Sequence, residues 1–294
     1  MKIGRSAGPL VLSVFVAAGF AHAAVPTSGV ARVRLVPYSP TLAAMAFEMG
    51  LGDRVVGVSR WARLPAGEAR PVIGDAVSVD VEALVAVRPD VVVVQGERIA
   101  GFDAVARIAP SVRVEAVRIE RLEDIAPAAR RLAVLADGSS GAEGAVADFE
   151  RALAALRAAS EPASRPRVLF VLGTSRPTVA GPGTFLADLI RLCGGINAGD
   201  DVPGRVLWRP ADLESIARAA PDVLICQVGE GEAAGAARTW WLSRTLIPAA
   251  RTGRVFVVEE PEWTIPSLAF ARFVPRLKEM LAPPAGAAPP PAVK

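Results

Sequence analysis

The sequence predicts an α/β fold made of two similar halves, each built on a parallel sheet. A block of residues occurs twice, at 80–95 and at 212–227, and both copies read Asp, an apolar residue, Glu, an amphipathic stretch, Pro-Asp, four apolar residues and Gln. The four-residue apolar runs do not alternate with polar residues, as expected of strands buried on both faces of a parallel sheet. A long Ala-rich helical segment separates the copies. We therefore expect two Rossmann-like lobes joined by one long backbone helix.

Each copy of the block carries its own helix start and helix end. Asp80 and Asp212 are good N-caps, because their side chains can accept the unpaired N–H groups at a helix start. Glu82 and Glu214 then fall in the first helical turn, where the helix dipole favours an acid. The proline of each copy ends the helix, since the residue before a proline disfavours the α region. The dipole alone would explain both glutamates, so the block by itself leaves a further role open.

The remaining elements alternate in the same way along the chain. Strands are expected at the short apolar runs 32–36, 55–58, 91–94, 112–117, 167–172, 223–226 and 255–258. Besides the two repeat helices, helices are expected at 41–49, 102–108, 122–135, 143–159, 185–193 and 268–281. The stretch 173–183 is rich in Gly, Pro and Thr and is expected to be a loop.

The longest helical segment, 143–159, places Val146, Phe149, Leu153 and Leu156 along one face. It divides the chain into lobes of comparable length. The expected segments are a signal peptide at 1–23, an N-terminal lobe at 24–138, a linking helix at 139–162, a C-terminal lobe at 163–282 and a disordered Pro- and Ala-rich tail at 283–294.

The first 23 residues have the pattern of an export signal. Lys2 and Arg5 precede an apolar stretch, 10–20, that is shorter than the about 20 residues needed to span a bilayer. Ala21-His22-Ala23 fits a small-x-small cleavage site, which places the mature start at Ala24 and the protein in the periplasm. A retained N-terminal anchor is the alternative. No cysteine follows the apolar stretch, so a lipoprotein is not expected.

Charge and composition exclude several function classes. Without Lys2 and Arg5, the 33 basic residues become 31 against 30 acidic ones, so the mature chain lacks the basic excess typical of nucleic-acid binding. The single histidine, His22, lies in the signal. This argues against an imidazole metal site and removes the usual base of a Ser-His or Cys-His catalyst. Cys193 and Cys226 could pair after export, but we favour separate buried thiols.

The loops after the strands are the expected ligand site, because open parallel sheets bind ligands at the carboxyl ends of their strands. Polar and aromatic residues with this placement are Tyr38, Trp61, Gln95, Glu97, Arg98, Ser175, Arg176, Gln227, Glu262 and Trp263, with Trp208 just before the second repeat helix. Several tryptophans around one cleft would form a flat apolar surface for a large ligand. Each could also pack within its own lobe, and the arginines could simply be solvated.

Taken in order and spacing, several stretches give the chain a family resemblance. They are Ser39-Pro40 with the helix to Gly50, Arg54 to Ser59, Val79-Asp80-Val81-Glu82 through Pro89-Asp90, Gly181 to Phe185, Cys193 to Asn197, and Trp208 through Glu214 to Pro221-Asp222. From about Val33 to Leu281 the chain resembles the periplasmic substrate-binding proteins of cobalamin and iron–siderophore ABC importers. The resemblance implies two lobes rigidly joined by a helix, with the ligand held between them. It also implies that Glu82 and Glu214 each pair with arginines of a membrane permease.

The resemblance is strongest to the cobalamin-binding subgroup. Trp61, Trp208 and Trp263 stand where that subgroup has aromatic residues. Ala76 and Gln95 differ, since some cobalamin binders have tryptophan at these positions. The cysteine that pairs with Cys193 in some relatives is also absent.

The sequence therefore predicts a non-catalytic, monomeric receptor that captures a corrinoid and delivers it to an ABC permease dimer in the inner membrane. It predicts neither catalytic residues, nor a metal site of its own, nor a covalently bound cofactor. The expected ligand contacts are Tyr38, Trp61, Gln95, Arg98, Arg176, Trp208 and Trp263, and the expected docking residues are Glu82 and Glu214.

Three alternatives remain open. A ferric siderophore or haem is the first, with an anionic chelate neutralised by Arg60, Arg98, Arg176 and Arg209 and with Tyr38 able to contact iron. An α/β enzyme is the second and more remote. Its acid–base candidates are Asp75, Asp80, Glu97, Ser175 and Glu262, but no nucleophile motif or phosphate-binding loop accompanies them. The third is a purely structural envelope protein, in which the aromatic residues would have no reason to cluster around a cleft.

Overall fold

The computed structural model describes residues 32–76, 78–96, 101–136, 140–159, 165–229 and 231–283. The elements below belong to one compact unit, Val33–Lys294. The expected signal peptide and nearly all of the expected C-terminal tail lie outside the described residues, as do Glu97 and Arg98. No helix in the described ranges has the length and apolarity required to cross a membrane.

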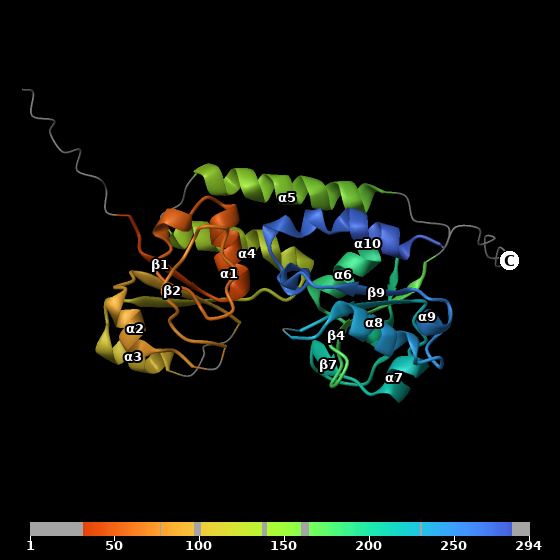
Figure 1. The fold of residues 1–294 in the computed structure, drawn as a ribbon. Helices are drawn as coiled ribbons and strands as arrows, with labels where there is room; N and C mark the ends of the chain where they lie inside the picture. Colours follow the sequence, from red (N-terminus) through yellow and green to blue (C-terminus); the bar gives the residue numbers. More distant parts are fainter. Residues whose placement is uncertain are drawn as a thin grey trace, which may run out of the picture. The chain divides into compact units, whose positions relative to one another are not determined.

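The first sheet is parallel and has three strands in the order β1-β2-β3 (Figure 1). Its strands are β1 (Leu35–Tyr38), β2 (Val91–Gln95) and β3 (Arg113–Val117). The helices of this part are α1 (Pro40–Glu48), α2 (Val81–Ala86), α3 (Phe102–Ile108) and α4 (Ile125–Leu135), with 3-10 turns η1 (Gly52–Arg54) and η2 (Leu122–Asp124). The valines of β2 are buried on both faces, which explains their unbroken apolar run.

The second sheet has six strands and is mixed. The order is β7-β5-β4-β8-β9, with β6 also paired to β4. The strands are β4 (Arg167–Leu172), β5 (Thr178–Ala180), β6 (Ile196–Asn197), β7 (Trp208–Pro210), β8 (Val223–Gln227) and β9 (Val255–Val258). β4, β6, β8 and β9 run parallel, whereas β5 is antiparallel to both β4 and β7.

The antiparallel strands differ from the expected purely parallel sheet. β5 lies within the stretch 173–183, which the sequence predicted to be a loop. After β4 the chain reverses through Gly173, whose φ of 66° lies in the left-handed region that glycine adopts readily. Val171 then pairs with Val179, and Trp208 pairs with Ala180 at the next strand. This places Trp208 in a strand rather than in a loop.

One long helix and a shared core connect the two sheets. α5 (Ser140–Ala158) runs along the top of the view in Figure 1. Val146, Phe149, Leu153 and Leu156 are buried, as their common helical face predicts. They belong to one hydrophobic cluster that also contains residues of β1, β2, β4 and β8.

The helices of the second part are short. They are α6 (Phe185–Leu192), α7 (Leu213–Arg218), α8 (Ala234–Leu242), α9 (Pro248–Arg251) and α10 (Val274–Leu281), with 3-10 turns η3 (Ala198–Asp201), η4 (Pro261–Thr264) and η5 (Leu268–Arg272). The single helix expected over 268–281 is thus a 3-10 turn followed by an α-helix. Similarly, the strand expected at 55–58 is reduced to isolated bridges at Val55 and Val58.

The repeated block has the same backbone in both places. Asp80 and Asp212 cap α2 and α7, accepting from Ala83 N at 2.9 Å and Ser215 N at 2.7 Å. The residues before the two prolines, Arg88 and Ala220, are both left-handed, with φ of 43° and 44°.

The match continues into the strands. Asp90 accepts from Arg34 N and Asp222 accepts from Arg167 N, each at 2.8 Å. The sequence repeat is therefore a structural repeat, and the expected α/β class is confirmed.

Candidate ligand-binding site

A cavity of about 650 Å³ lies where segments attached to both sheets meet. Tyr38 and Gln95, at the carboxyl ends of β1 and β2, line it. The start of α6 and the residues just before η5 line it as well. The site therefore forms at the strand ends, where an open α/β sheet usually places its ligand.

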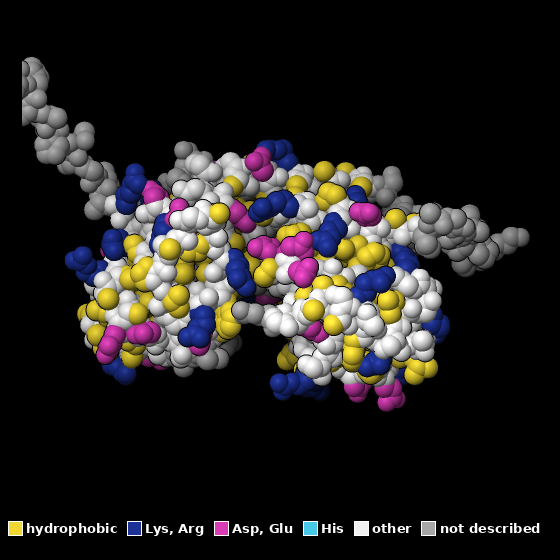
Figure 2. All heavy atoms as spheres, viewed as in Figure 1, with side chains coloured by type: hydrophobic (Ala, Val, Ile, Leu, Met, Phe, Trp, Pro, Cys, Tyr) yellow, Lys and Arg dark blue, Asp and Glu magenta, His cyan; other side chains and the backbone are white. Residues whose placement is uncertain are grey.

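Hydrophobic, acidic and basic side chains are interspersed on the face of the molecule shown in Figure 2.

Two tryptophans face this cavity and a third does not. Trp61 lines it with 52% of its surface exposed. Trp208 also lines it, packed edge-on against Phe170 with 6.5 Å between the ring centroids. Trp263, which was expected in the site, is only 1% exposed. Its ring stacks on Phe170, with 6.4 Å between the ring centroids. The structure thus places Trp263 in the core behind the site. Phe185, which lines the cavity, was not identified from the sequence.

Tyr38 and Gln95 line the cavity with their polar groups already engaged. The Tyr38 hydroxyl donates to Ser78 O at 2.7 Å, and Gln95 Nε2 donates to Ile119 O at 3.1 Å. Burial raises the pKa of Tyr38 to about 12, and the nearby carboxylate of Asp75 adds to this rise. Tyr38 is therefore a neutral phenol at physiological pH.

The charged residues of the cavity are two acids and two bases. They are Asp75, Glu120, Arg63 and Arg118. Arg118 pairs with Glu120 at 3.1 Å, and Asp75 accepts from the backbone N–H and hydroxyl of Ser78 at 3.1 and 3.3 Å. The lining is thus balanced in charge.

The arginines expected to meet an anionic ligand are placed elsewhere. Arg176 is exposed in a separate groove that it shares with Glu214 and Trp240. Arg209 donates to the backbone carbonyls of residues 199, 200 and 202. Arg60 does not line the cavity, and Arg98 lies outside the described residues. None of these arginines in the described ranges therefore lines the cavity, where the sequence analysis had placed them.

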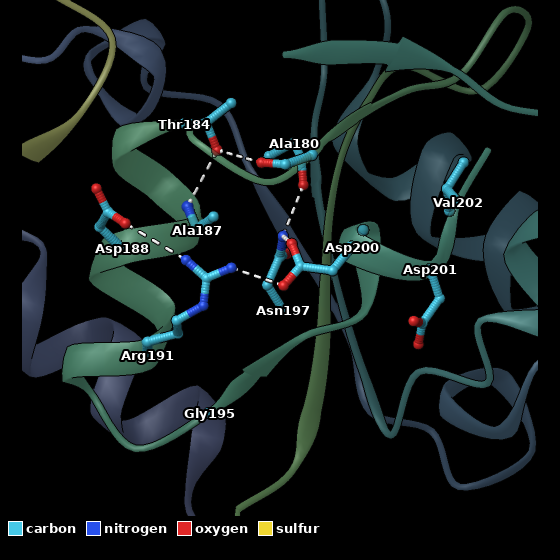
Figure 3. A network of polar contacts seen from close by, with 12 residues as sticks. Ala180, Thr184, Ala187, Asp188, Arg191, Gly195, Asn197, Asp200, Asp201 and Val202 are labelled. Atoms are coloured by element: carbon cyan, nitrogen blue, oxygen red, sulfur yellow. Dashed lines mark hydrogen bonds and ion pairs between the residues drawn. The ribbon is translucent and has the colours of Figure 1, made fainter. Parts of the chain in front are cut away.

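A polar network holds the start of α6 against the second sheet (Figure 3). Thr184 caps α6 by accepting from Ala187 N at 3.1 Å, and Asn197 donates to Ala180 O at 3.0 Å and to Asp200 at 2.7 Å. Arg191 then joins Asp200 at 2.6 Å to Asp188 at 3.3 Å. This network fixes the cavity wall formed by Thr184 and the phenylalanine after it.

Two further contacts join segments far apart in sequence next to the cavity. Arg121 and Leu122 N both donate to Asp188, at 2.9 to 3.2 Å. Glu48, at the end of α1, accepts from Ser267 Oγ at 2.8 Å and from Leu268 N at 2.9 Å. Burial raises the pKa of Glu48, although these hydrogen bonds oppose the rise. The cavity is therefore framed by fixed contacts on both sides.

The residues considered for an enzyme do not gather in one place. Asp75 lines the cavity, but Asp80 caps α2, Ser175 lies in the separate groove with Arg176, and Glu262 is exposed in η4. Across the described ranges, no three His, Cys, Asp or Glu side chains are grouped closely enough to hold a metal ion. Cys193 and Cys226 are both buried and unpaired.

Glu82 and Glu214 are both exposed, in the first turns of α2 and α7. Both helices lie in the lower half of the view in Figure 1. Glu214 has an exposed side chain, at 79%, and its one ion pair in the described part of the chain is to Arg218 at 3.4 Å. Such an exposed pair contributes little and leaves the carboxylate accessible.

The fold and the cavity together define a ligand-binding protein built from two β-sheets with flanking helices and one long connecting helix. The chain belongs to the periplasmic binding protein family, whose model matches residues 35–261. Proteins of this family are the substrate-binding components of ABC importers and act outside the cytoplasm.

Similar proteins include vitamin B12-binding and heme-binding proteins. The chain is 26% identical over 250 residues to a vitamin B12-binding protein of Pectobacterium carotovorum subsp. carotovorum (strain PC1), covering 83% of this chain and 84% of the relative. The structure of the periplasmic heme-binding protein BhuT in complex with two hemes is similar, with a TM-score of 0.72, 27% identity, and coverage of 85% of this chain and 99% of that one. The vitamin B12-binding protein BtuF of Vibrio cholerae shares the fold, with a TM-score of 0.72, 19% identity, and coverage of 85% and 96%.

Proposed function

We propose that this protein is a non-catalytic receptor that captures a corrinoid, most simply cobalamin, and delivers it to an ABC permease dimer in the inner membrane. The observation that carries the proposal is the composition of the cavity. Aromatic faces from Trp61, Trp208 and Phe185 line it together with two carboxylates and two guanidinium groups. A large ligand with an apolar face and a neutral polar periphery matches this lining.

The balanced charge supports a corrinoid over haem. The side-chain amides of a corrin ring both donate and accept hydrogen bonds, so they can pair with Asp75 and Glu120 as well as with Arg63 and Arg118. The carboxylates of haem only accept, and two acids in the same cavity would repel them.

The state of Tyr38 also supports a corrinoid. Tyrosine binds ferric iron through its phenolic oxygen, but the Tyr38 hydroxyl is already engaged as a donor to Ser78 O at 2.7 Å. The only histidine of the chain is His22, within the expected signal. The cobalt of a corrinoid is already held by its ring nitrogens and by axial groups that the ligand brings with it, so it requires no protein side chain.

Haem or a ferric siderophore is the second candidate. Arg63 and Arg118 favour it, because both guanidinium groups line the cavity and could meet carboxylates. The structural similarity to the heme-bound BhuT supports it as well.

Tryptophan fluorescence separates these candidates. Cyanocobalamin, haemin and a ferric siderophore are titrated in turn into the wild type and into the Trp61→Ala, Trp208→Ala and Trp240→Ala variants. We expect cyanocobalamin to quench the wild-type fluorescence and to bind more weakly to the Trp61→Ala and Trp208→Ala variants. Trp240 lies outside the cavity and serves as the matched control. Absence of quenching by cyanocobalamin, with quenching by haemin, would favour the second candidate.

We further propose that Glu82 and Glu214 dock the receptor onto the permease. Both carboxylates are exposed at structurally equivalent positions of the repeat, which supports a pair of matching contacts with a dimeric partner. The double variant Glu82→Lys, Glu214→Lys should keep ligand affinity and lose transport in cells. Transport at the wild-type rate would contradict docking through these residues.

We also propose how the protein is exported and where its two lobes begin and end. The protein reaches the periplasm through the signal at 1–23 and acts as a monomer. Its lobes span 24–138 and 163–282, joined by the helix at 139–162. N-terminal sequencing of the exported protein tests the cleavage before Ala24, and a mature protein that begins at Met1 would show a retained anchor instead.

A further inference from the structure

The segment that carries Trp61 presents three different groups to the cavity. Ser59, Trp61 and Arg63 line it, whereas the two residues between them do not. The segment turns here, because Ala62 N donates to Ser59 O at 3.0 Å. The three lining residues form a stripe along the ligand space. Ser59 is 4% exposed, Trp61 is about half exposed and Arg63 is exposed. The stripe thus runs from a buried hydroxyl, through an indole, to a guanidinium at the open end.

The backbone around Ser59 is held by the neighbouring segment 71–74. Val58 N donates to Pro71 O at 3.0 Å, Ile73 N donates to Val58 O at 2.9 Å, and Arg60 N donates to Gly74 O at 2.8 Å. The same neighbouring segment packs closely here, because a Cβ on Gly57 would lie 2.0 Å from Ile73 Cδ1. Ser59 therefore cannot move away from the cavity without breaking these contacts.

The Ser59 hydroxyl is buried and has no hydrogen-bond partner within the described residues. A hydroxyl in this situation is unfavourable, because its hydration is lost and nothing in the protein replaces it. Buried polar groups are nearly always paired in folded proteins, so an unpaired one requires an explanation.

Other buried atoms without a partner are not comparable. In the described part of the chain they belong to Asn197, Gln227, Trp241, Arg244 and Trp263, and none of these residues lines the cavity. Ser59 alone among them is a residue that lines the cavity. Its partner is therefore expected on the ligand.

We propose that Ser59 is a specificity-determining residue whose hydroxyl donates a hydrogen bond to an amide carbonyl on the edge of the corrin ring. This inference rests on the proposed function. A neutral carbonyl suits the buried end of the stripe, because one hydroxyl could not compensate the burial of an anion. The phosphodiester of the nucleotide loop suits the open end, where the exposed Arg63 can pair with it.

The Ser59→Ala variant tests the role, because it removes only the hydroxyl oxygen. Affinities for cyanocobalamin and for dicyanocobinamide, which lacks the nucleotide but keeps the ring amides, are measured by calorimetry together with the ligand-free Tm. Both affinities should fall about tenfold, equal to about 1.4 kcal/mol. The ligand-free Tm should stay the same or rise by about 2 °C, because an unpaired buried group is removed.

Ser243→Ala is the matched control, because its hydroxyl donates to Trp240 O and neither residue lines the cavity. This variant should bind both ligands normally. Unchanged affinity in Ser59→Ala, with a wild type that binds, would overturn the role of Ser59 and leave the corrinoid function intact. A lowered Tm would show a partner inside the protein and would also overturn it. A loss for cyanocobalamin but not for dicyanocobinamide would overturn the assignment to a ring amide. A wild type that binds neither corrinoid would refute the proposed function itself, and the inference with it.

Discussion

Arg121 donates two hydrogen bonds to the carboxylate of Asp188, at 3.2 and 2.9 Å, and so ties the segment after β3 to helix α6. The two residues are 67 positions apart, and Asp188 is only 13% exposed. The same carboxylate accepts from Leu122 N and pairs with Arg191. Three residues therefore donate hydrogen bonds to one nearly buried acid beside the ligand cavity.

Removing the charge of Asp188 should destabilise the protein. Asp188→Asn keeps the shape but removes the charge that two guanidinium groups share, so the free energy of unfolding should fall by about 2 kcal/mol. Urea denaturation measures the change. Asp148→Asn is the control, because the Asp148–Arg151 pair is exposed and should contribute less than about 0.5 kcal/mol. Equal effects of the two substitutions would show that Asp188 is an ordinary surface acid.

Ala220, the left-handed residue of the second repeat, is a position where substitution by glycine should increase stability. Ala220 has a φ of 44°, a conformation that costs a residue with a Cβ about 1–2 kcal/mol. Ala220→Gly should therefore stabilise the protein by up to about 1 kcal/mol, after the larger chain entropy of glycine is subtracted. The neighbouring Ala219 has a φ of −64°, so Ala219→Gly should destabilise by about 1 kcal/mol. Thermal unfolding of both variants checks the pair, and destabilisation by both would contradict the assignment.

Tyr38 can be titrated without interference, because it is the only tyrosine in the chain. Its phenolate absorbance should appear with a midpoint near pH 12 in the folded protein. In urea the midpoint should return to about 10. Because the folded pKa lies above the unfolded one, stability is complete below about pH 10 and falls as the pH rises beyond it. A folded-state midpoint near 10, with circular dichroism confirming the fold, would show that Tyr38 is not buried as described.

Glu48 should make stability depend on pH in the acidic range. Burial raises its pKa in the folded state, so the folded protein holds this proton more tightly than the unfolded chain. Its contribution is complete below the unfolded pKa of about 4.3 and is lost as the pH rises through the folded pKa. Relative to Glu48→Gln, the wild type should therefore lose stability as the pH rises above the unfolded pKa of about 4.3. Urea denaturation across this range measures the difference, and a difference that stays constant or grows in favour of the wild type would contradict it.

The repeat made much of the fold predictable from sequence. Asp80 and Asp212, with their prolines, mark helix ends by local chemistry alone, and the structure shows both caps and both buried strands. The antiparallel β5 could not be predicted, because it depends on pairing with β4 and β7 rather than on its own three residues.

The ligand site was harder to predict from sequence, because it also depends on contacts between distant segments. A tryptophan after a strand can face a ligand or the core, and Trp263 faces the core because Phe170 and Phe273 lie against it. Ser59 carries no distinguishing sequence signal, since its importance arises only from a buried hydroxyl beside a cavity. Sequence patterns report which residues are near a strand end, but packing decides where each side chain points.

Calorimetric titration of cyanocobalamin at pH 7 into the chain without its first 23 residues measures directly whether the protein binds a corrinoid. We expect one ligand per protein with a Kd of about 1 µM or tighter, and haemin binding at least about tenfold more weakly. No binding of cyanocobalamin at about 100 µM, or tighter binding of haemin, would contradict the assignment of this cavity to a corrinoid.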